Sequence, residues 1–325
     1  MVSGSHIDRM SRATNVGDAV GIISETDIGS YLEGVTVHGF EDMEAALWEY
    51  LAGRIAHINA FKFIPGDMRK ATRAFAVKYD VANVKATVQG IVTGMKTPLI
   101  PLGTMHEDGF AGELRAAETI HDVADVLTRS RLPDLAPVVK AYDPSGGTRS
   151  KIALESSLES QYFHGMQRTS RSILDGNVLA AAYGLLIDLT NLSIVCRAVV
   201  EAIGPAAADF LISGGHVIEE KALRDVLPYK LSDIPRRIDA PQYRGMLEEI
   251  STSYDRTKSV TVIDEVIERH KFTALRDLLS PRVLSPLVVI WYLILKETEV
   301  RNLRLILKAI TDGVAVEEVK RYLLI

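Results

Sequence analysis

The stretch that decides the fold covers residues 296–310. It reads Lys296-Glu297-Thr298-Glu299-Val300-Arg301-Asn302-Leu303-Arg304-Leu305-Ile306-Leu307-Lys308-Ala309-Ile310. Apolar residues stand two positions before Asn302 and one, five and eight positions after it. At roughly 100° per residue these four positions gather on one face, which predicts an amphipathic helix.

Two related stretches occur earlier, around Asn83 and Asn191. An acid stands three residues before each Asn, and the four apolar positions are kept. The acids are Asp80, Asp188 and Glu299, and the apolar residues of the two earlier copies are Val81, Val84, Val88, Ile91 and Leu189, Leu192, Cys196, Val199. Similarity at a fixed period, here about 110 residues, is typical of repeat proteins. We therefore expect three units, covering residues 1–115, 116–225 and 226–325.

The acid and the Asn of each copy lie at the border of the apolar face, one helical turn apart. A half-buried amide needs hydrogen-bond partners, so we expect both side chains to bond to the end of a neighbouring helix. A small residue seven positions after the Asn would let that helix approach; these residues are Gly90, Ala198 and Ala309. We therefore take six residues as structural repeat positions, namely Asp80, Asn83, Asp188, Asn191, Glu299 and Asn302. The alternative is three ordinary amphipathic helices with a chance Asn in each.

Other elements recur in the same order within each unit. A capped short helix is expected at residues 26–32, 121–127 and 232–238. An acid-rich helix follows at residues 43–51, 154–163 and 263–272, and then a lead-in helix of roughly ten residues, the Asn helix and a Gly-containing break. No alternating run is long enough to propose a sheet. The sequence thus predicts an all-α fold of three pseudo-repeated helical bundles, with a surface loop at residues 142–151.

The composition excludes several classes of function. A net charge of −5 and a pI of about 5.9 argue against a nucleic-acid partner. The only cysteine, Cys196, lies on an apolar helix face and is expected to be a small core residue. We expect no signal peptide. The longest apolar runs, residues 178–187 and 287–295, are about half the length that a membrane span needs, so no direct span is expected.

The sequence offers no recognisable catalytic constellation. The eight histidines have no zinc-binding spacing. Residues 90–97 miss the phosphate-loop pattern, because three residues separate the glycines and Met95 splits the Gly-Lys-Thr order. No Ser or Cys nucleophile has a recognisable base. We therefore predict no catalytic residue, no cofactor and no metal, and a protein that is not itself an enzyme.

The three Asn helices resemble those of the C subunit of the archaeal and bacterial (V/A-type) rotary ATPases, the relative of the d subunit of vacuolar proton pumps. The matching segments are residues 79–84, 188–192 and 296–303, and the glycine break at residues 214–217 and the short helix around Asp122 also fit. The resemblance covers about residues 20–325. The middle copy departs from the pattern, since Thr190 and Ser193 replace more charged neighbours, and residues 1–20 diverge.

The resemblance implies a helical funnel of three related bundles with pseudo-threefold symmetry. Such a protein caps the membrane rotor ring and receives the lower end of the central axle of the ATP-hydrolysing or ATP-synthesising head. It would be a monomer within a hetero-oligomeric complex, peripheral on the cytoplasmic side of the cell membrane. It would couple rotation to proton or sodium transport without binding nucleotide.

Two other functions remain open from the sequence. One is a helical-repeat adaptor that binds other proteins in a groove and needs capping units at its ends. The other is an all-helical enzyme with a central pocket of clustered carboxylates. A wide, metal-free mouth would favour the rotor subunit over the enzyme.

Overall fold

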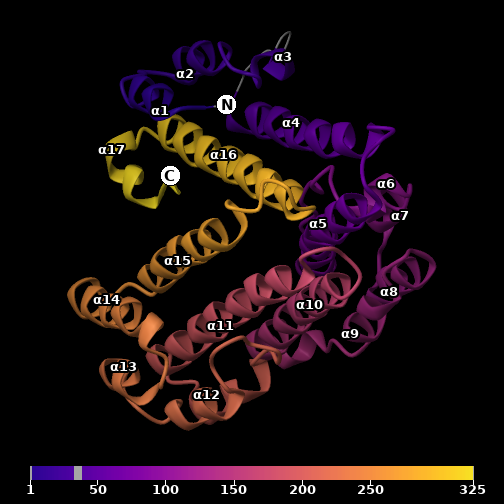
Figure 1. Ribbon diagram of the computed structural model, residues 1–325. Coiled ribbons are helices and arrows are strands. Elements are labelled where there is room, and N and C mark those ends of the chain that lie inside the picture. Colours follow the sequence, from indigo (N-terminus) through magenta and orange to yellow (C-terminus); the bar gives the residue numbers. More distant parts are fainter. Residues whose placement is uncertain (1, 33–38, 325) are drawn as a thin grey trace. The chain divides into compact units, whose positions relative to one another are not determined.

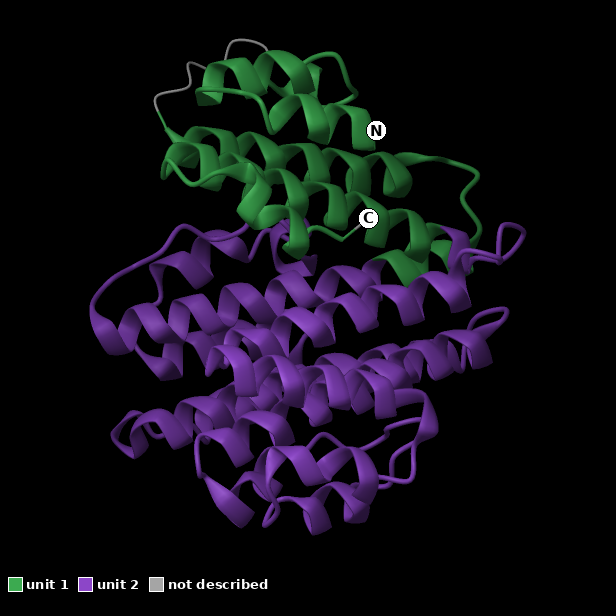
Figure 2. Cartoon of the chain, turned by 90° about the vertical axis from the view of Figure 1, so that its left-hand side faces the viewer, with its two compact units in different colours: residues 1–72, 289–325 green, residues 73–288 purple. Residues whose placement is uncertain are grey.

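The computed structural model describes residues 2–32 and 39–324 (Figure 1). The chain is 75% helical, and the described residues contain no β-strand. The prediction of an all-α fold is therefore confirmed. The helices form two compact units (Figure 2), of which unit 1 comprises residues 1–72 and 289–325 and unit 2 comprises residues 73–288.

Unit 1 is built from both ends of the chain. Its helices are α1 (Gly4–Met10), α2 (Val16–Ile23), α3 (Gly29–Leu32), α4 (Phe40–Ala60), most of α16 (Leu287–Thr311), α17 (Val316–Val319) and η5 (Lys320–Tyr322). Residues 2–20, which diverge from the family pattern, contain α1 and the start of α2. The Asn15 side chain caps α2 by accepting the Asp18 N–H. The buried side chains of α4 include Leu47, Tyr50 and Leu51.

Unit 2 begins inside α5 (Gly66–Thr93) and is continuous in sequence. It then contains α6 (Thr104–Glu107), α7 (Ala111–Ala116), α8 (Ile120–Arg129), η1 (Pro133–Leu135), α9 (Ala136–Lys140), η2 (Pro144–Gly146), α10 (Gly147–Ser170), α11 (Gly176–Val200), η3 (Gly204–Phe210), α12 (Glu220–Val226), η4 (Leu231–Asp233), α13 (Ile234–Arg237), α14 (Pro241–Thr257) and α15 (Thr261–Leu279).

Helix α11 is the central helix of unit 2 and packs against α10 and α15. It is long and apolar enough to cross a membrane by length and composition, and 61% of its most apolar window is buried inside the unit. A helix that is apolar on most of its faces belongs in a core. The burial of α11 therefore explains its composition.

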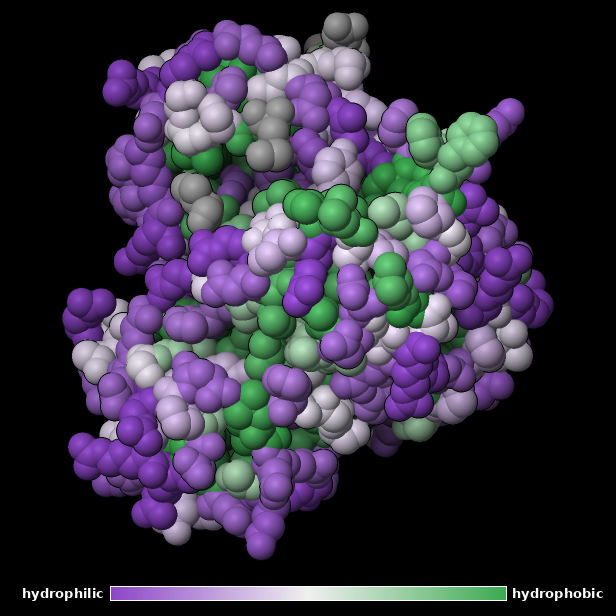
Figure 3. All heavy atoms as spheres, viewed as in Figure 1, coloured by the Kyte–Doolittle hydropathy of each residue, from purple (hydrophilic) through white to green (hydrophobic). Residues whose placement is uncertain are grey.

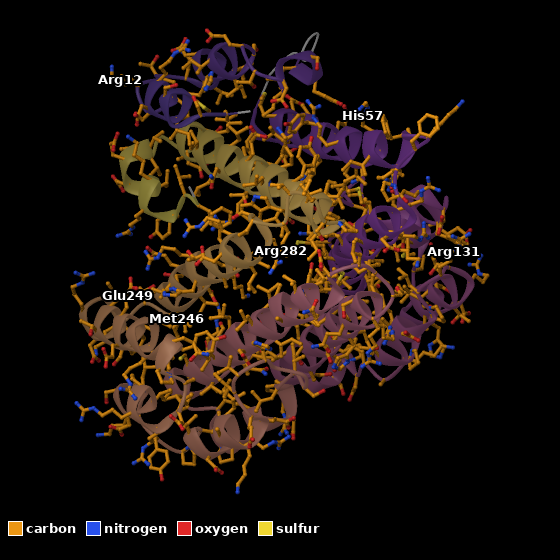
Figure 4. The ribbon with its side chains drawn as sticks, in the orientation of Figure 1. Arg12, His57, Arg131, Met246, Glu249 and Arg282 are labelled. Carbon is orange, nitrogen blue, oxygen red and sulfur yellow. The ribbon has the colours of Figure 1, made fainter. Side chains whose placement is uncertain are left out.

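Helix α14 is amphipathic, as two residues within one of its turns show. Figure 4 labels Met246 and Glu249 on it; Met246 is buried in the core and Glu249 pairs with Arg269 of α15 at 2.5 Å. Hydrophilic side chains accordingly cover most of the face drawn in Figure 3, with hydrophobic ones visible between them. This is the distribution expected when helices turn their apolar faces inward.

The prediction of separate lead-in helices is wrong. Each Asn helix is one unbroken helix of 25 to 28 residues: α5 contains Asn83, α11 contains Asn191 and α16 contains Asn302. Helix α16 has no Gly or Pro to stop it. In α11 the one glycine beyond the first turn, Gly184, lets His216 approach, since a Cβ there would lie 2.8 Å from the His216 Cβ.

Two further local predictions need correction. The loop expected at residues 142–151 ends early, because α10 begins at Gly147. The short helix expected at residues 121–127 begins at Ile120, with Thr119 as its cap in a capping box with Asp122. The other expected short helices are α3 and the η4–α13 pair, and Asp233 makes no capping hydrogen bond at the start of α13.

The start of α11 depends on a residue without a side chain. A Cβ at Gly176 would lie 1.6 Å from the Ser170 carbonyl oxygen. We expect Gly176→Ala to lower the free energy of unfolding by about 1–3 kcal/mol, because the backbone must shift to relieve the overlap. Gly245→Ala in α14 is the matched control. A Cβ at Gly245 would meet nothing within 4 Å, so this change should raise stability by about 0.5–1 kcal/mol. Urea unfolding of both variants checks the prediction. Equal changes in the free energy of unfolding for the two variants would contradict it.

Candidate functional site

The six residues singled out from the sequence are all buried. Their exposed fractions are at most 7%. Burying carboxylates and amides costs free energy unless each finds hydrogen-bond partners. The partners therefore decide what these residues do.

Each Asn side chain pairs with both backbone groups of a single residue further along the chain. In α5, Asn83 accepts the Ile100 N–H at 2.8 Å and donates to the Ile100 carbonyl at 2.9 Å. In α11, Asn191 does the same with Ile212, at 2.8 and 2.7 Å. In α16, Asn302 pairs with Leu324, at 3.1 and 2.7 Å. We call these three arrangements the Asn clamps.

The clamps differ from the expected contact with a helix end. Ile100, Ile212 and Leu324 are all outside helices, in the segments that follow the Asn helices. The small residue at Gly90 also faces such a segment rather than a second helix, because a Cβ there would lie 3.2 Å from the Met95 carbonyl oxygen. Each clamp therefore returns the chain onto the helix that it has just left.

The acids of α5 and α11 bind backbone N–H groups. Asp80 accepts the N–H and hydroxyl of Thr104, both at 2.8 Å, and the Met105 N–H at 2.9 Å, at the first turn of α6. Here the predicted contact with a helix end is present. Asp188 accepts N–H groups from a loop rather than a helix. These come from His216, Val217 and Ile218, at 3.2, 2.8 and 3.4 Å.

Burial is the main influence on these two carboxyl groups. It raises the pKa of Asp80 to about 6, although the hydrogen bonds from Met105 and Thr104 act in the opposite direction. Burial likewise raises the pKa of Asp188, and the N–H groups of Val217, Ile218 and His216 partly offset it.

The third acid, Glu299, belongs to a buried ionic cluster in unit 1. Its carboxylate accepts Lys296 Nζ and the Tyr50 hydroxyl, both at 3.0 Å, and the Val2 N–H. Lys296 also pairs with Asp27 at 3.0 Å, and the Tyr50 hydroxyl donates to Asp27 at 2.9 Å. Lys296 is 4% exposed and Glu299 7%. The cluster joins the N-terminal segment, α4 and α16.

This cluster was not predicted from the sequence. Lys296 and Glu299 are three residues apart and could be interpreted as neighbours on a helix. Nothing in the sequence linked them to Asp27 or Tyr50, which lie near the other end of the chain. Burial acts to raise the pKa of Asp27, but the hydrogen bonds from Lys296 and Tyr50 outweigh it and hold the pKa well below its usual range.

Three ion pairs join an Asn helix to an acid-rich helix. Lys85 of α5 pairs with Glu159 of α10 at 2.6 Å. Arg197 of α11 pairs with Asp264 of α15, with Nε 3.1 Å from Oδ1. Arg304 of α16 pairs with Glu44 of α4. The six side chains are between 24% and 44% exposed, so each pair adds little stability.

The hydrogen bonds of these six side chains serve to hold segments of the backbone in place. No group of three His, Cys, Asp or Glu side chains within residues 2–32 and 39–324 is placed to hold a metal ion. Whether the six residues are equivalent positions of an internal repeat stays a prediction.

The middle clamp gives a direct test of this stabilising role. We expect Asn191→Leu to lower the free energy of unfolding by about 1–3 kcal/mol, because the buried N–H and carbonyl of Ile212 lose their partners. The matched control is Asn177→Leu. Asn177 is exposed on the same helix, so this substitution should change the free energy of unfolding little. Thermal and urea unfolding report both values. Equal stability of the two variants would count against the clamp.

The raised pKa of Asp80 predicts a pH dependence of stability. The unfolded carboxyl titrates near 3.8 and the folded one at about 6, so between these values the folded chain retains a proton that the unfolded chain has released. Stability from this group is full below pH 3.8 and falls as the pH rises to about 6, by up to about 3 kcal/mol. Asp80→Asn should remove this slope. Urea unfolding of the unsubstituted protein and of Asp80→Asn, from pH 4 to pH 7, checks this prediction. If the free energy of unfolding depends on pH in the same way for both proteins, the prediction is refuted.

Comparison with known proteins places these features in a family. The family model described as "ATP synthase (C/AC39) subunit" matches residues 1–322. The C subunit of the A-type ATP synthase of Methanobrevibacter smithii is 24% identical, over 89% of this chain and 80% of its own. The C subunits from Methanocaldococcus jannaschii and Thermococcus onnurineus are 22% and 24% identical over 98% of this chain, and over 81% and 85% of theirs. The chain, all-helical and matched over nearly its whole length, belongs to the ATP synthase (C/AC39) subunit family.

Proposed function

We propose that this chain is a non-catalytic central-stalk subunit of an A-type rotary ATPase. It joins the rotor axle of the soluble head to the membrane rotor ring, so that ATP hydrolysis or synthesis is coupled to proton or sodium transport. Its partners are the ring and the axle subunits, and it lies peripherally on the cytoplasmic side of the membrane. It contributes no catalytic residue and no cofactor.

The observation that carries the proposal is the order of the three ion pairs. The Lys85–Glu159 pair joins the first predicted repeat, residues 1–115, to the second, residues 116–225. The Arg197–Asp264 pair joins the second to the third, residues 226–325, and the Arg304–Glu44 pair joins the third back to the first. The cycle supports a closed, pseudo-threefold array of bundles.

Closure favours the rotor subunit over the adaptor. An open repeat array stacks each unit only on its neighbours and needs capping units at both ends. A closed array of three has no ends and surrounds an axis, which suits a part that must receive an axle. We infer that the three repeat units form the funnel that the family resemblance implies.

The three Asn clamps support the same proposal. A stiff body transmits torque with little twist of its own. Each clamp fixes the segment after an Asn helix to that helix by two hydrogen bonds, so that the segment and the helix move together. We propose that the repeat positions give the funnel its rigidity; these are Asp80, Asn83, Asp188, Asn191, Glu299 and Asn302.

A rebinding assay tests this function. The soluble head and this chain are stripped from membranes that keep the rotor ring, and the head is then added back with or without the purified chain. We expect the head to rebind, and ATP-driven ion transport to recover, only when the folded chain is present; heat-denatured chain is the control. Equal rebinding without the chain would overturn the proposal and favour a helical-repeat adaptor.

A further inference from the structure

Exposed apolar side chains concentrate in three short connections between long helices. Residues 61–65 join α4 to α5, residues 171–175 join α10 to α11, and residues 280–286 join α15 to α16. We call these the apolar connections. Single apolar residues scattered over a surface need no explanation. Of the nine large apolar side chains that are exposed among the described residues, however, five belong to these connections, namely Phe61, Phe63, Leu174, Val283 and Leu284.

The connection between α15 and α16 shows how such side chains are presented. The Ser285 N–H donates to the Arg282 carbonyl at 3.1 Å and closes a four-residue turn. Val283 and Leu284 occupy the two central positions of this turn, where Gly, Pro, Asn, Asp and Ser are the usual residues. Leu284 is 97% exposed. The turn therefore holds two apolar side chains outward at its apex.

The other two apolar connections contain a turn of the same kind. In residues 61–64 the last N–H donates to the first carbonyl at 3.1 Å, and the exposed Phe63 is central. In residues 173–176 the corresponding hydrogen bond is 3.2 Å long, and the exposed Leu174 is central. An apolar side chain at the apex of a turn points away from the core that its own helices form. Each connection thus presents apolar surface beyond the helix ends.

Two of the apolar connections lie at the same end of unit 2. Helices α11 and α15 pack against each other. Arg197, near the end of α11, pairs with Asp264, near the start of α15. The two helices therefore run antiparallel, and the end of α15 lies towards the start of α11. Residues 171–175 precede α11 and residues 280–286 follow α15, so both connections belong to this end of the helix pair.

Each apolar connection also carries an exposed cation. The three are Lys62, Arg171 and Arg282, the last of which is labelled in Figure 4. None of them makes an ion pair within residues 2–32 and 39–324. The only acid in the three connections is the half-buried Asp175, although the whole chain has a net charge of −5. The connections are thus cationic as well as apolar, in contrast to the rest of the chain.

We propose that the two apolar connections of unit 2 dock on an anionic lipid surface. Leu174, Val283 and Leu284 enter the boundary between headgroups and acyl chains, and Arg171 and Arg282 bond to lipid phosphates. A lipid layer deforms around a projecting apolar side chain, whereas a folded protein would need a matching pocket for each one. The connection at residues 61–65 of unit 1 has the same composition, so the same binding is expected of it.

Sedimentation of the isolated full chain with lipid vesicles tests the proposal independently of the rotor function. The vesicles contain equal parts of phosphatidylcholine and phosphatidylglycerol, and vesicles of phosphatidylcholine alone are the comparison. We expect binding to the anionic vesicles to be at least about fivefold stronger, since each cation near an anionic surface contributes about that factor. Added salt should weaken it. Equal binding to both kinds of vesicle, or no binding to the anionic ones, would overturn the proposal.

Paired variants locate the contact. Leu284→Ser should weaken binding to the anionic vesicles about tenfold, because the side chain no longer leaves water. Met95→Ser, 74% exposed in the segment after α5, should leave binding unchanged. Arg282→Gln should weaken it about fivefold, and Arg256→Gln, exposed on α14, should not. All four side chains are exposed, so the variants should fold. Equal binding by Leu284→Ser and Met95→Ser would refute the contact.

Fluorescence distinguishes insertion into lipid from adsorption on its surface. We expect the emission of Leu284→Trp to shift to shorter wavelength when anionic vesicles are added, and to be quenched by lipids with brominated acyl chains. The emission is compared with that of the unsubstituted protein, which contains Trp48 and Trp291. Met95→Trp should show neither change. Unaltered emission of Leu284→Trp on bound vesicles would overturn the proposed insertion.

The same variants separate a lipid contact from a contact with the rotor ring. Membranes that carry the ring are compared with protein-free vesicles of the same lipids. Binding to the protein-free vesicles that Leu284→Ser weakens supports the lipid contact. Binding to the ring-carrying membranes alone, again weakened by Leu284→Ser, would mean that a protein of the ring covers the connections and would overturn the proposal. The rotor function is decided separately, by whether the soluble head rebinds.

Discussion

The pairing of one Asn side chain with both backbone groups of one residue is the interaction on which the rest of the structure depends. A primary amide carries a donor and an acceptor side by side, as a peptide unit does, so it can replace a strand neighbour for a residue outside any sheet. Asn191 does this for Ile212, at 2.7 and 2.8 Å. Ile100, Ile212 and Leu324 themselves lie outside helices, and the amide satisfies backbone groups that would otherwise lack a partner.

The buried carboxyl groups of Asp80 and Glu299 have different kinds of partners. Asp80 is held by neutral hydrogen-bond donors, and burial raises its pKa. Glu299 has Lys296 at 3.0 Å, and the pair is shared with Asp27 and Tyr50. Removing one partner of such a buried group leaves an uncompensated charge, which is more costly than the pair is favourable. The cluster therefore makes the position of the N-terminal segment on α4 and α16 specific, whether or not it adds net stability.

The sequence predicted the helices well and their contacts poorly. The 3.6-residue periodicity around Asn83, Asn191 and Asn302 identified the three long helices, because burial of one face is a local property of the sequence. It did not identify their lengths, since the lead-in residues have no stop signal and simply continue the helix. The partners of the Asn residues are 17 to 22 residues away and depend on how the chain returns. Two partners of Lys296, Asp27 and Tyr50, come from the other end of the chain, and no local sequence pattern links residues so far apart.

The composition of unit 1 from residues 1–72 and 289–325 has a consequence for biosynthesis. Unit 2 is continuous in sequence, whereas Tyr50 of α4 finds its partners Lys296 and Glu299 only after α16 has been translated. During this interval the segment 1–72 exposes apolar surface, the state in which nascent chains aggregate or recruit chaperones. Pairing of the two ends is thus the last event, and a chain terminated before Lys296 leaves Asp27 its pair with Arg54 but not the ammonium of Lys296. A chain that stops before α16 therefore lacks the residues that complete the buried cluster of unit 1.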